Sequence, residues 1–209
     1  MLSDMGVMIN RRRVYGGKKL PYDAEIEYLE STGTQWIDTG ITLISNMRMS
    51  VTYQIVKFRD NTVLVGSNNS KSNMYSIGMF EWQGNYHCTT NYSKTTSHGI
   101  LKALDHFVTV EKKENKTFSG GTTIVEDTIQ NTFTLGKCLL FYASGIHEQP
   151  FVNPALVRIA AFSLKDNSDN LLCDLIPVRV GSTGYMYDKV SKQLFGNAGT
   201  GKFILGPDK

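Results

Sequence analysis

Long apolar runs are missing from this 209-residue sequence. No run approaches the roughly 20 apolar residues that a membrane-spanning helix needs, so we expect no membrane span. The opening residues place an acid before a short apolar run and the bases after it, which reverses the order found in a signal peptide. We therefore expect the chain to be made inside the cell without a signal peptide.

Cysteine is also scarce. Cys88, Cys138 and Cys173 are widely spaced, and no Cys-x-x-Cys occurs, which argues against a zinc ribbon or a thioredoxin-like site. Each cysteine lies among apolar or aromatic neighbours, and buried free thiols behave as small hydrophobic groups. The pattern favours a reduced, intracellular place of synthesis.

Several catalytic and ligand-binding motifs are absent. No Glu-x-Asp occurs to place two carboxylates on one strand face at the spacing that retaining glycosidases use, and no Gly-x-Ser-x-Gly occurs. No two of the four histidines stand two or four residues apart. We expect a protein that is not an enzyme and that carries no cofactor.

One segment imitates a nucleotide-binding loop. Residues 196–202 fit the pattern Gly-x-x-x-x-Gly-Lys, but Phe203 stands where Ser or Thr should bind magnesium. Gly206 and Pro207 leave no room for the helix that a phosphate site needs. We expect a tight turn between two short strands.

Charge is unevenly distributed. Residues 1–20 carry five bases and one acid, whereas the other 189 residues carry 17 bases and 18 acids. The five bases are Arg11, Arg12, Arg13, Lys18 and Lys19. A basic N-terminal arm on a neutral body predicts contact with a partner, and a solvated tail is the alternative. We favour a protein partner over nucleic acid, because the body adds no basic stripe to five bases.

Alternation of apolar and polar residues dominates the body. In residues 47–55, Met47, Met49, Val51, Tyr53 and Ile55 alternate with polar residues, which is typical of a half-buried strand. Further strands are predicted at 24–28, 62–66, 73–80, 85–92, 106–112, 122–126, 132–135, 138–143, 155–165, 170–180, 184–187 and 203–205. A dozen short, evenly spaced strands predict an all-β sandwich or barrel. We expect one domain over residues 21–209, preceded by the arm 1–20.

Three segments resemble a known family. Residues 20–41, which contain Ser31-Thr-Gly-Thr-Gln-Trp-Ile-Asp-Thr-Gly40, are similar to its opening signature. Residues 155–165, 175–179 and 184–201 are similar to its last strands and closing signature. The family is the concanavalin A-like (LamG-like) jelly-roll module of gut Bacteroidales and their phages. The resemblance implies two antiparallel sheets packed face to face, with the first and last strands of the body close together.

The resemblance leaves function open, because this fold hosts lectins, glycanases and assembly modules. A short chain with one module and the start Met8-Ile-Asn-Arg-Arg-Arg13 is similar in layout to a phage virion component. We therefore expect a non-catalytic, homo-oligomeric virion protein, either capsid-decorating, head-fibre or tail-associated. Its arm would dock on other structural proteins of the same particle. The alternative is a lectin-like module at the bacterial cell surface that binds a cell-surface or dietary glycan.

Two groups of residues are candidate ligand sites. Trp82, Asn85, Tyr86 and Tyr92 combine flat rings with an amide around Gly84, as a glycan platform does, although core packing is the competing interpretation. Asp166 and Asp169 are weak calcium candidates, because their loop lacks the order of acidic residues found in a dedicated calcium loop. An Asx-rich hairpin turn explains the same residues.

Overall fold

The computed structural model describes residues 14–15, 18–58, 62–70, 73–82, 85–92, 95–100, 105–126, 132, 134–142 and 153–209. These residues form strands and the turns between them, with no helix in the described ranges. Accordingly, this part of the chain contains no helix long and apolar enough to cross a membrane.

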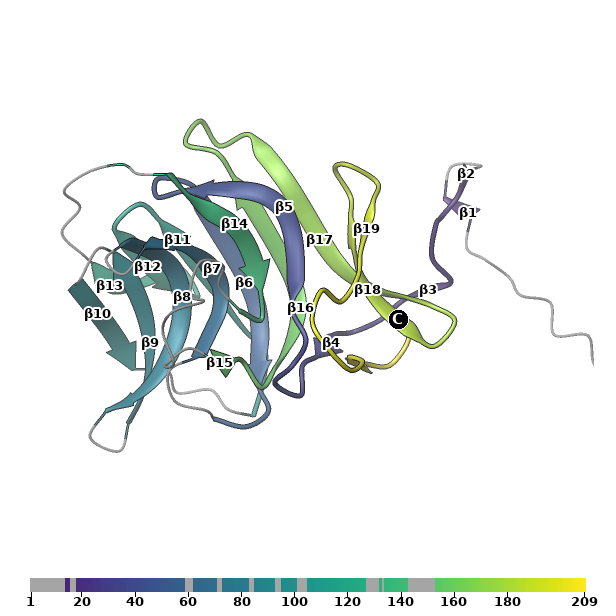
Figure 1. Ribbon diagram of the computed structural model, residues 1–209, viewed down its shortest axis with the longest axis horizontal. Helices are drawn as coiled ribbons and strands as arrows, with labels where there is room; N and C mark the ends of the chain where they lie inside the picture. The colour runs from purple at the N-terminus through teal and green to yellow at the C-terminus, as the bar shows by residue number, and fades with distance from the viewer. Residues whose placement is uncertain are drawn as a thin grey trace, which may run out of the picture.

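Two sheets, which we call the larger and the smaller sheet, build the body (Figure 1). The larger sheet runs in the order β13-β12-β11-β6-β16-β17-β18-β19, with β3, β4 and β20 added along it. Its strands are β3 Ala24–Glu25, β4 Leu29–Glu30, β6 Arg48–Ile55, β11 Val108–Lys113, β12 Lys116–Ser119, β13 Thr122–Glu126, β16 Val157–Lys165, β17 Leu171–Val180, β18 Thr183–Asp188, β19 Leu194–Phe195 and β20 Ile204–Leu205. All of its pairings among the described residues are antiparallel.

The smaller sheet runs in the order β10-β9-β8-β7-β14-β5, and β15 adds a short parallel pairing with β7. Its strands are β5 Ile37–Ile44, β7 Thr62–Ser70, β8 Asn73–Trp82, β9 Asn85–Tyr92, β10 Thr95–Ile100, β14 Thr134–Leu140 and β15 Asn153–Pro154. The fold is the jelly-roll β-sandwich that the sequence predicted.

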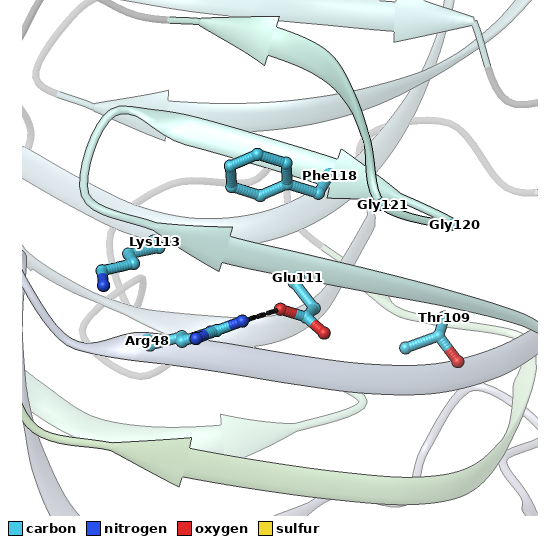
Figure 2. Close-up of a pocket in the computed structure, with 7 residues that line it drawn as sticks. All are labelled: Arg48, Thr109, Glu111, Lys113, Phe118, Gly120 and Gly121. Atoms are coloured by element: carbon cyan, nitrogen blue, oxygen red, sulfur yellow. Dashed lines mark hydrogen bonds and ion pairs between the residues drawn. The ribbon is translucent and has the colours of Figure 1, made fainter. Parts of the chain in front are cut away.

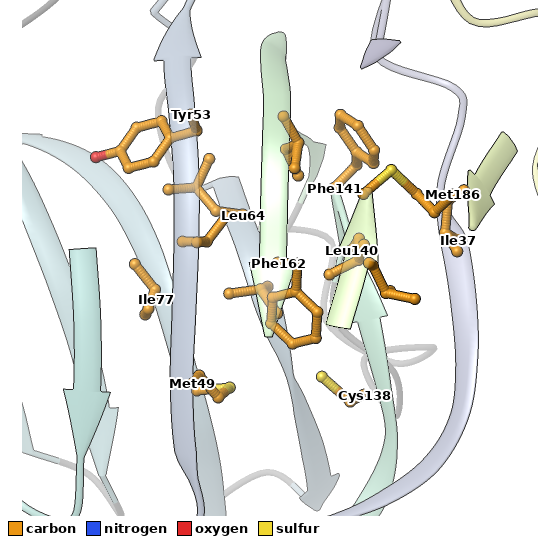
Figure 3. Packing of buried hydrophobic residues seen from close by; sticks show 14 of the residues in the cluster. Ile37, Met49, Tyr53, Leu64, Ile77, Cys138, Leu140, Phe141, Phe162 and Met186 are labelled. Carbon is orange, nitrogen blue, oxygen red and sulfur yellow. The ribbon is translucent and has the colours of Figure 1, made fainter. Parts of the chain in front are cut away.

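The core lies between the two sheets (Figure 3). On β6 the side chains of Met49, Val51 and Tyr53 are fully buried, and the residues between them are half-buried on the opposite face. Phe162 of β16 joins them from the neighbouring strand, and Leu140 of β14 from the smaller sheet. Burying each such side chain stabilises the fold by roughly 1.5–3 kcal/mol. The alternation predicted at 47–55 is therefore confirmed.

The first and last strands of the body are adjacent, as the resemblance implied. β4 pairs with β20, with Leu29 opposite Leu205, and Ile26 forms a bridge with Asp208. The chain before β5 also pairs with the turn before β20, because Ala198 N donates to Trp36 O at 2.9 Å and Thr200 N donates to Thr34 O at 3.0 Å. The opening and closing segments thus fold against each other.

The sequence prediction missed three strands of four or more residues, β5, β10 and β12, and the two-residue strands β1, β2, β4, β15 and β19. β5 contains Gly40, which has φ +72°, and its pairing with β14 shifts register between Asp38 and Thr42, the segment that holds this residue, and again between Thr42 and Ile44. Asp38 Oδ1 accepts a hydrogen bond from Gly40 N at 2.7 Å and holds the bulge. β14 is a single strand where two, 132–135 and 138–143, were predicted, because its irregular register also breaks the apolar alternation.

A smaller apolar cluster, which we call the second cluster, covers the outer side of β17 and β18. Tyr22, Val178 and Tyr187 are its buried members, with the Tyr22 and Tyr187 rings 5.0 Å apart. Leu20 packs against them, so the last residue of the predicted arm contacts the body. Ahead of it, β1 Val14–Tyr15 and β2 Lys18–Lys19 pair with each other as a hairpin outside the two sheets (Figure 1).

Candidate functional site

An open pocket of about 430 Å³ lies on the outer face of the larger sheet, over β6, β11 and β12 (Figure 2). It is lined by Arg48, Thr109, Glu111, Lys113, Phe118, Gly120 and Gly121. Strands contribute five of these side chains, and the β12–β13 turn contributes the two glycines. A site on paired strands is held more rigidly than one on loops.

Strand register brings the polar side chains together. Residues on β6 with even numbers face outward, because the odd-numbered ones fill the core. Arg48 stands opposite Lys113 on β11, and Glu111 stands opposite Phe118 on β12. Alternating residues of paired strands share one face, so two basic groups, one acid and one aromatic ring project on the same side.

An ion pair orders the centre of the pocket. Glu111 Oε2 accepts hydrogen bonds from Arg48 Nη2 at 2.6 Å and from Arg48 Nε at 3.2 Å. This contact with Glu111 raises the pKa of Arg48 above its ordinary value. Both side chains are about one-third exposed, so the pair contributes at most about 1 kcal/mol to stability. Its main effect is to fix where the guanidinium and the carboxylate point.

A second acid balances the charge of the pocket. Asp169, in the β16–β17 turn, lies 3.6 Å from Arg48 and 3.6 Å from Lys113. Two cations therefore face two carboxylates, with donors and acceptors side by side. The half-buried ring of Phe118 adds a flat apolar surface at the same place (Figure 2).

Of the predicted glycan residues, the structure describes the backbone alone. Trp82 stands opposite Asn85, and Tyr86 opposite Glu81, in the antiparallel pair that β8 and β9 form. Tyr92 stands opposite Tyr75. The side chains of Trp82, Asn85, Tyr86 and Tyr92 lie outside the described structure, and their role stays a prediction.

The predicted arm is described only in part. Arg11, Arg12 and Arg13 lie outside the described residues, and Lys18 and Lys19 are placed by their backbone in β2. Docking of the arm on a partner stays a prediction.

The calcium candidates have protein partners. Asp166 Oδ1 accepts from Ser168 N at 2.8 Å and from Asn170 N at 2.9 Å, while Oδ2 accepts from Asn170 Nδ2 at 2.8 Å. The bond with Asn170 is the main reason why the pKa of Asp166 is lowered. Asp169, with φ 62°, faces the two cations of the pocket. The described ranges hold no group of three or more His, Cys, Asp or Glu arranged for a metal, and an Asx turn accounts for this loop.

The segment that imitates a phosphate loop is a turn between β19 and β20, as predicted. Three consecutive amides of this turn donate within the protein: Ala198 N and Thr200 N to backbone carbonyls, and Gly199 N to Asn197 Oδ1 at 2.9 Å. These three amides are therefore not available to bind a nucleotide phosphate.

Cys138 and Cys173 are buried free thiols in the core. Burial raises the pKa of Cys138 well above its ordinary value and that of Cys173 to about 12. Both are therefore the inert hydrophobic groups that their apolar neighbours predicted. The side chain of Cys88 lies outside the described structure.

Comparison with known proteins identifies the fold. No protein-family model and no curated protein sequence matches this chain. Among solved structures, it is similar to a proposed carbohydrate-binding protein from Bacteroides ovatus, with a TM-score of 0.59 and 8% sequence identity. They share a fold. The match covers 88% of this chain and 61% of the Bacteroides chain, so this chain spans about three fifths of that protein.

Sequence reasoning missed the pocket, although half of it could be inferred. The alternation at 47–55 placed Arg48 on the outer face of a strand, and the strand predicted at 106–112 contained Thr109 and Glu111. Phe118 was missed because β12 is only four residues long and joins β11 through the tight turn at Glu114 and Asn115. No local pattern in a single sequence indicates that the β11–β12 hairpin lies beside β6.

Proposed function

We propose that this protein is a non-catalytic carbohydrate-binding module of the concanavalin A-like type, and that its pocket over β6, β11 and β12 holds the sugar. The observation that carries this proposal is the combination of an apolar ring with fixed donors and acceptors in one pocket on a sheet. Sites for small polar ligands combine apolar surface with a few well-placed polar groups. The similar Bacteroides structure, a proposed carbohydrate-binding protein, gives independent support.

The charge balance indicates a neutral glycan. Arg48 and Lys113, the two cations that line the pocket in the described residues, are each paired with a carboxylate, so the lining itself carries no excess positive charge for a phosphate or a uronic acid. Binding to nucleic acid depends on cations that replace the counterions of the phosphates. Sugar hydroxyls both donate and accept hydrogen bonds, and they suit a pocket that offers both kinds of partner.

Retardation of the protein in gels that contain starch, mannan, xylan or β-glucan tests the proposal. We expect at least one of these polymers to retard the wild-type chain. Phe118→Ala should weaken that retardation by about 1 kcal/mol, roughly fivefold, because it removes the stacking surface. Tyr185→Ala removes a half-buried ring of β18 outside the pocket and serves as the matched control. Absence of retardation by all four polymers, or equal loss in both variants, contradicts the proposal.

The absence of catalysis is tested separately. The sequence has no Glu-x-Asp pair, and the glutamate of the pocket is held by Arg48. Incubation of the purified protein with the polymer it binds should release no reducing sugar. Release of reducing sugar that is abolished by Glu111→Gln would show that the protein is an enzyme.

A further inference from the structure

A second group of aromatic and charged side chains lies on the same outer face as the pocket. The guanidinium of Arg158, on β16, lies 4.5 Å from the centre of the Tyr28 ring, and the Phe107 ring lies 5.9 Å from that ring. Arg158 is held in place by Glu30 Oε2, which accepts from Nε at 2.7 Å, and by Gln54 Oε1, which accepts from Nη1 at 3.1 Å. We call Tyr28, Phe107 and Arg158 the distal cluster.

Register places the distal cluster in line with the pocket. Thr109 lines the pocket, and Phe107, which directly precedes β11, lies two residues before it, up to roughly 7 Å along an extended chain. At the level of the cluster, Arg158 stands opposite Gln54, on the outward-facing row of β6 that begins with Arg48. From residue 113 to residue 107 the face extends roughly 20 Å along the strand.

Small hydroxyl groups connect the two ends. Thr52 Oγ1 and Thr109 Oγ1 form a hydrogen bond of 2.8 Å across β6 and β11. Ser50 and Ser163 are directly opposite each other on the next outward position of β6 and β16. The face therefore has an aromatic ring and an arginine both in the pocket and in the distal cluster, with short hydroxyl side chains beside the pocket and between the two groups.

We propose that this face binds an extended neutral polysaccharide chain that lies along β6 and β11. The pocket and the distal cluster bind different sugar units of this one chain. The proposal rests on the carbohydrate-binding function proposed above and names the length class of the ligand. A single sugar unit would contact the pocket alone and make no contact with the distal cluster. In the distal cluster, as in the pocket, the arginine is paired with a carboxylate, which again favours an uncharged chain.

A length series of oligosaccharides tests this inference. Linear fragments from disaccharide to octasaccharide, prepared from whichever of the four polymers retards the protein most, are titrated against it by calorimetry. We expect affinity to rise with length until both ends are occupied. Phe107→Ala should lower the affinity for the octasaccharide roughly tenfold and leave that for the disaccharide unchanged.

A second variant disturbs the distal cluster from another strand. Gln54→Ala removes the acceptor of the hydrogen bond from Arg158 Nη1, and we expect it to reduce the gain with length while the pocket still binds the disaccharide. Phe118→Ala should weaken the binding of both ligands, and Tyr185→Ala that of neither. If disaccharide and octasaccharide bind the wild type equally well, or if neither Phe107→Ala nor Gln54→Ala weakens octasaccharide binding, the extended site is overturned but the proposed function stands. If neither the disaccharide nor the octasaccharide binds, both the extended site and the proposed carbohydrate-binding function are overturned.

Discussion

At the scale of single residues, Asp188 shows how a buried charge is kept in a sheet protein. It is 2% exposed, at the end of β18. Its carboxylate accepts hydrogen bonds from Asp174 N at 2.8 Å, from Val190 N at 3.0 Å, and from Ser191 N at 2.9 Å and Oγ at 2.6 Å. Burial by itself would raise the pKa of Asp188, but these bonds outweigh it and lower the pKa below 3.8. The charged form therefore stabilises the turn.

Replacing Asp188 with Asn should destabilise the protein by about 2 kcal/mol, because one of the buried donors loses its acceptor. In the wild type this contribution is present above pH 3.8, the ordinary pKa, and is lost as the pH falls through the lower folded-state pKa. Urea unfolding at pH 7 and at pH 3 measures both effects. The difference between wild type and Asp188→Asn should shrink at the lower pH, and a constant difference would contradict this account.

At the scale of elements, the contact between residues 34–36 and residues 197–202 joins the two ends of the body. Besides the backbone bonds, Gln35 Nε2 donates to Lys202 O at 3.2 Å and Thr34 Oγ1 donates to Thr200 O at 3.0 Å. Gly199 makes this approach possible. A Cβ there would overlap the carbonyl oxygen of Thr34 and lie 2.6 Å from a ring carbon of Trp36.

Gly199→Ala should therefore separate the two segments and cost about 2 kcal/mol, or roughly 5 °C in Tm. Gly181→Ala is the control, since Gly181 has φ +57° but nothing within 4 Å of a Cβ. It should cost only the backbone penalty of about 1 kcal/mol. Thermal unfolding of both variants gives the comparison. Equal Tm values for the two variants would show that the close contact at Gly199 adds nothing to the cost of the substitution.

The strands differ in how well a single sequence could predict them. β6 was predictable because its four core-facing apolar residues, and Met47 just before them, alternate with polar residues without a break. β5 was not, because Asp38 and Gly40 form a bulge whose hydrogen bond to Gly40 N overrides the alternation. The order of strands in the two sheets depends on contacts between distant segments, which local patterns do not encode. For the same reason the pocket was missed, since Arg48 and Glu111 are 63 residues apart.

At the scale of the whole molecule, we predict that the sandwich and the N-terminal hairpin contribute to stability separately. Removal of residues 1–19 should shift Tm by less than about 2 °C, because β1 and β2 pair with each other and not with the two sheets. Removal of residues 1–23 should lower Tm clearly, since it also takes Leu20 and Tyr22 from the second cluster. Scanning calorimetry of the two truncated chains tests the boundary. A large decrease in Tm after removal of residues 1–19 would show that the hairpin is part of the folded body.

The pairing of β4 with β16 and β20 has a consequence for how the protein is made. Residues 24–36 emerge early from the ribosome, yet their partners are residues 157–159, 177–179 and 197–208. Contacts between such distant segments slow folding, and strand edges that wait for a partner are prone to aggregate. Ribosome-bound chains stopped at residue 193 should be digested rapidly by protease, whereas released chains resist. Production of this protein therefore depends on protecting residues 24–36 until residues 197–208, which pair with them, have also been synthesised.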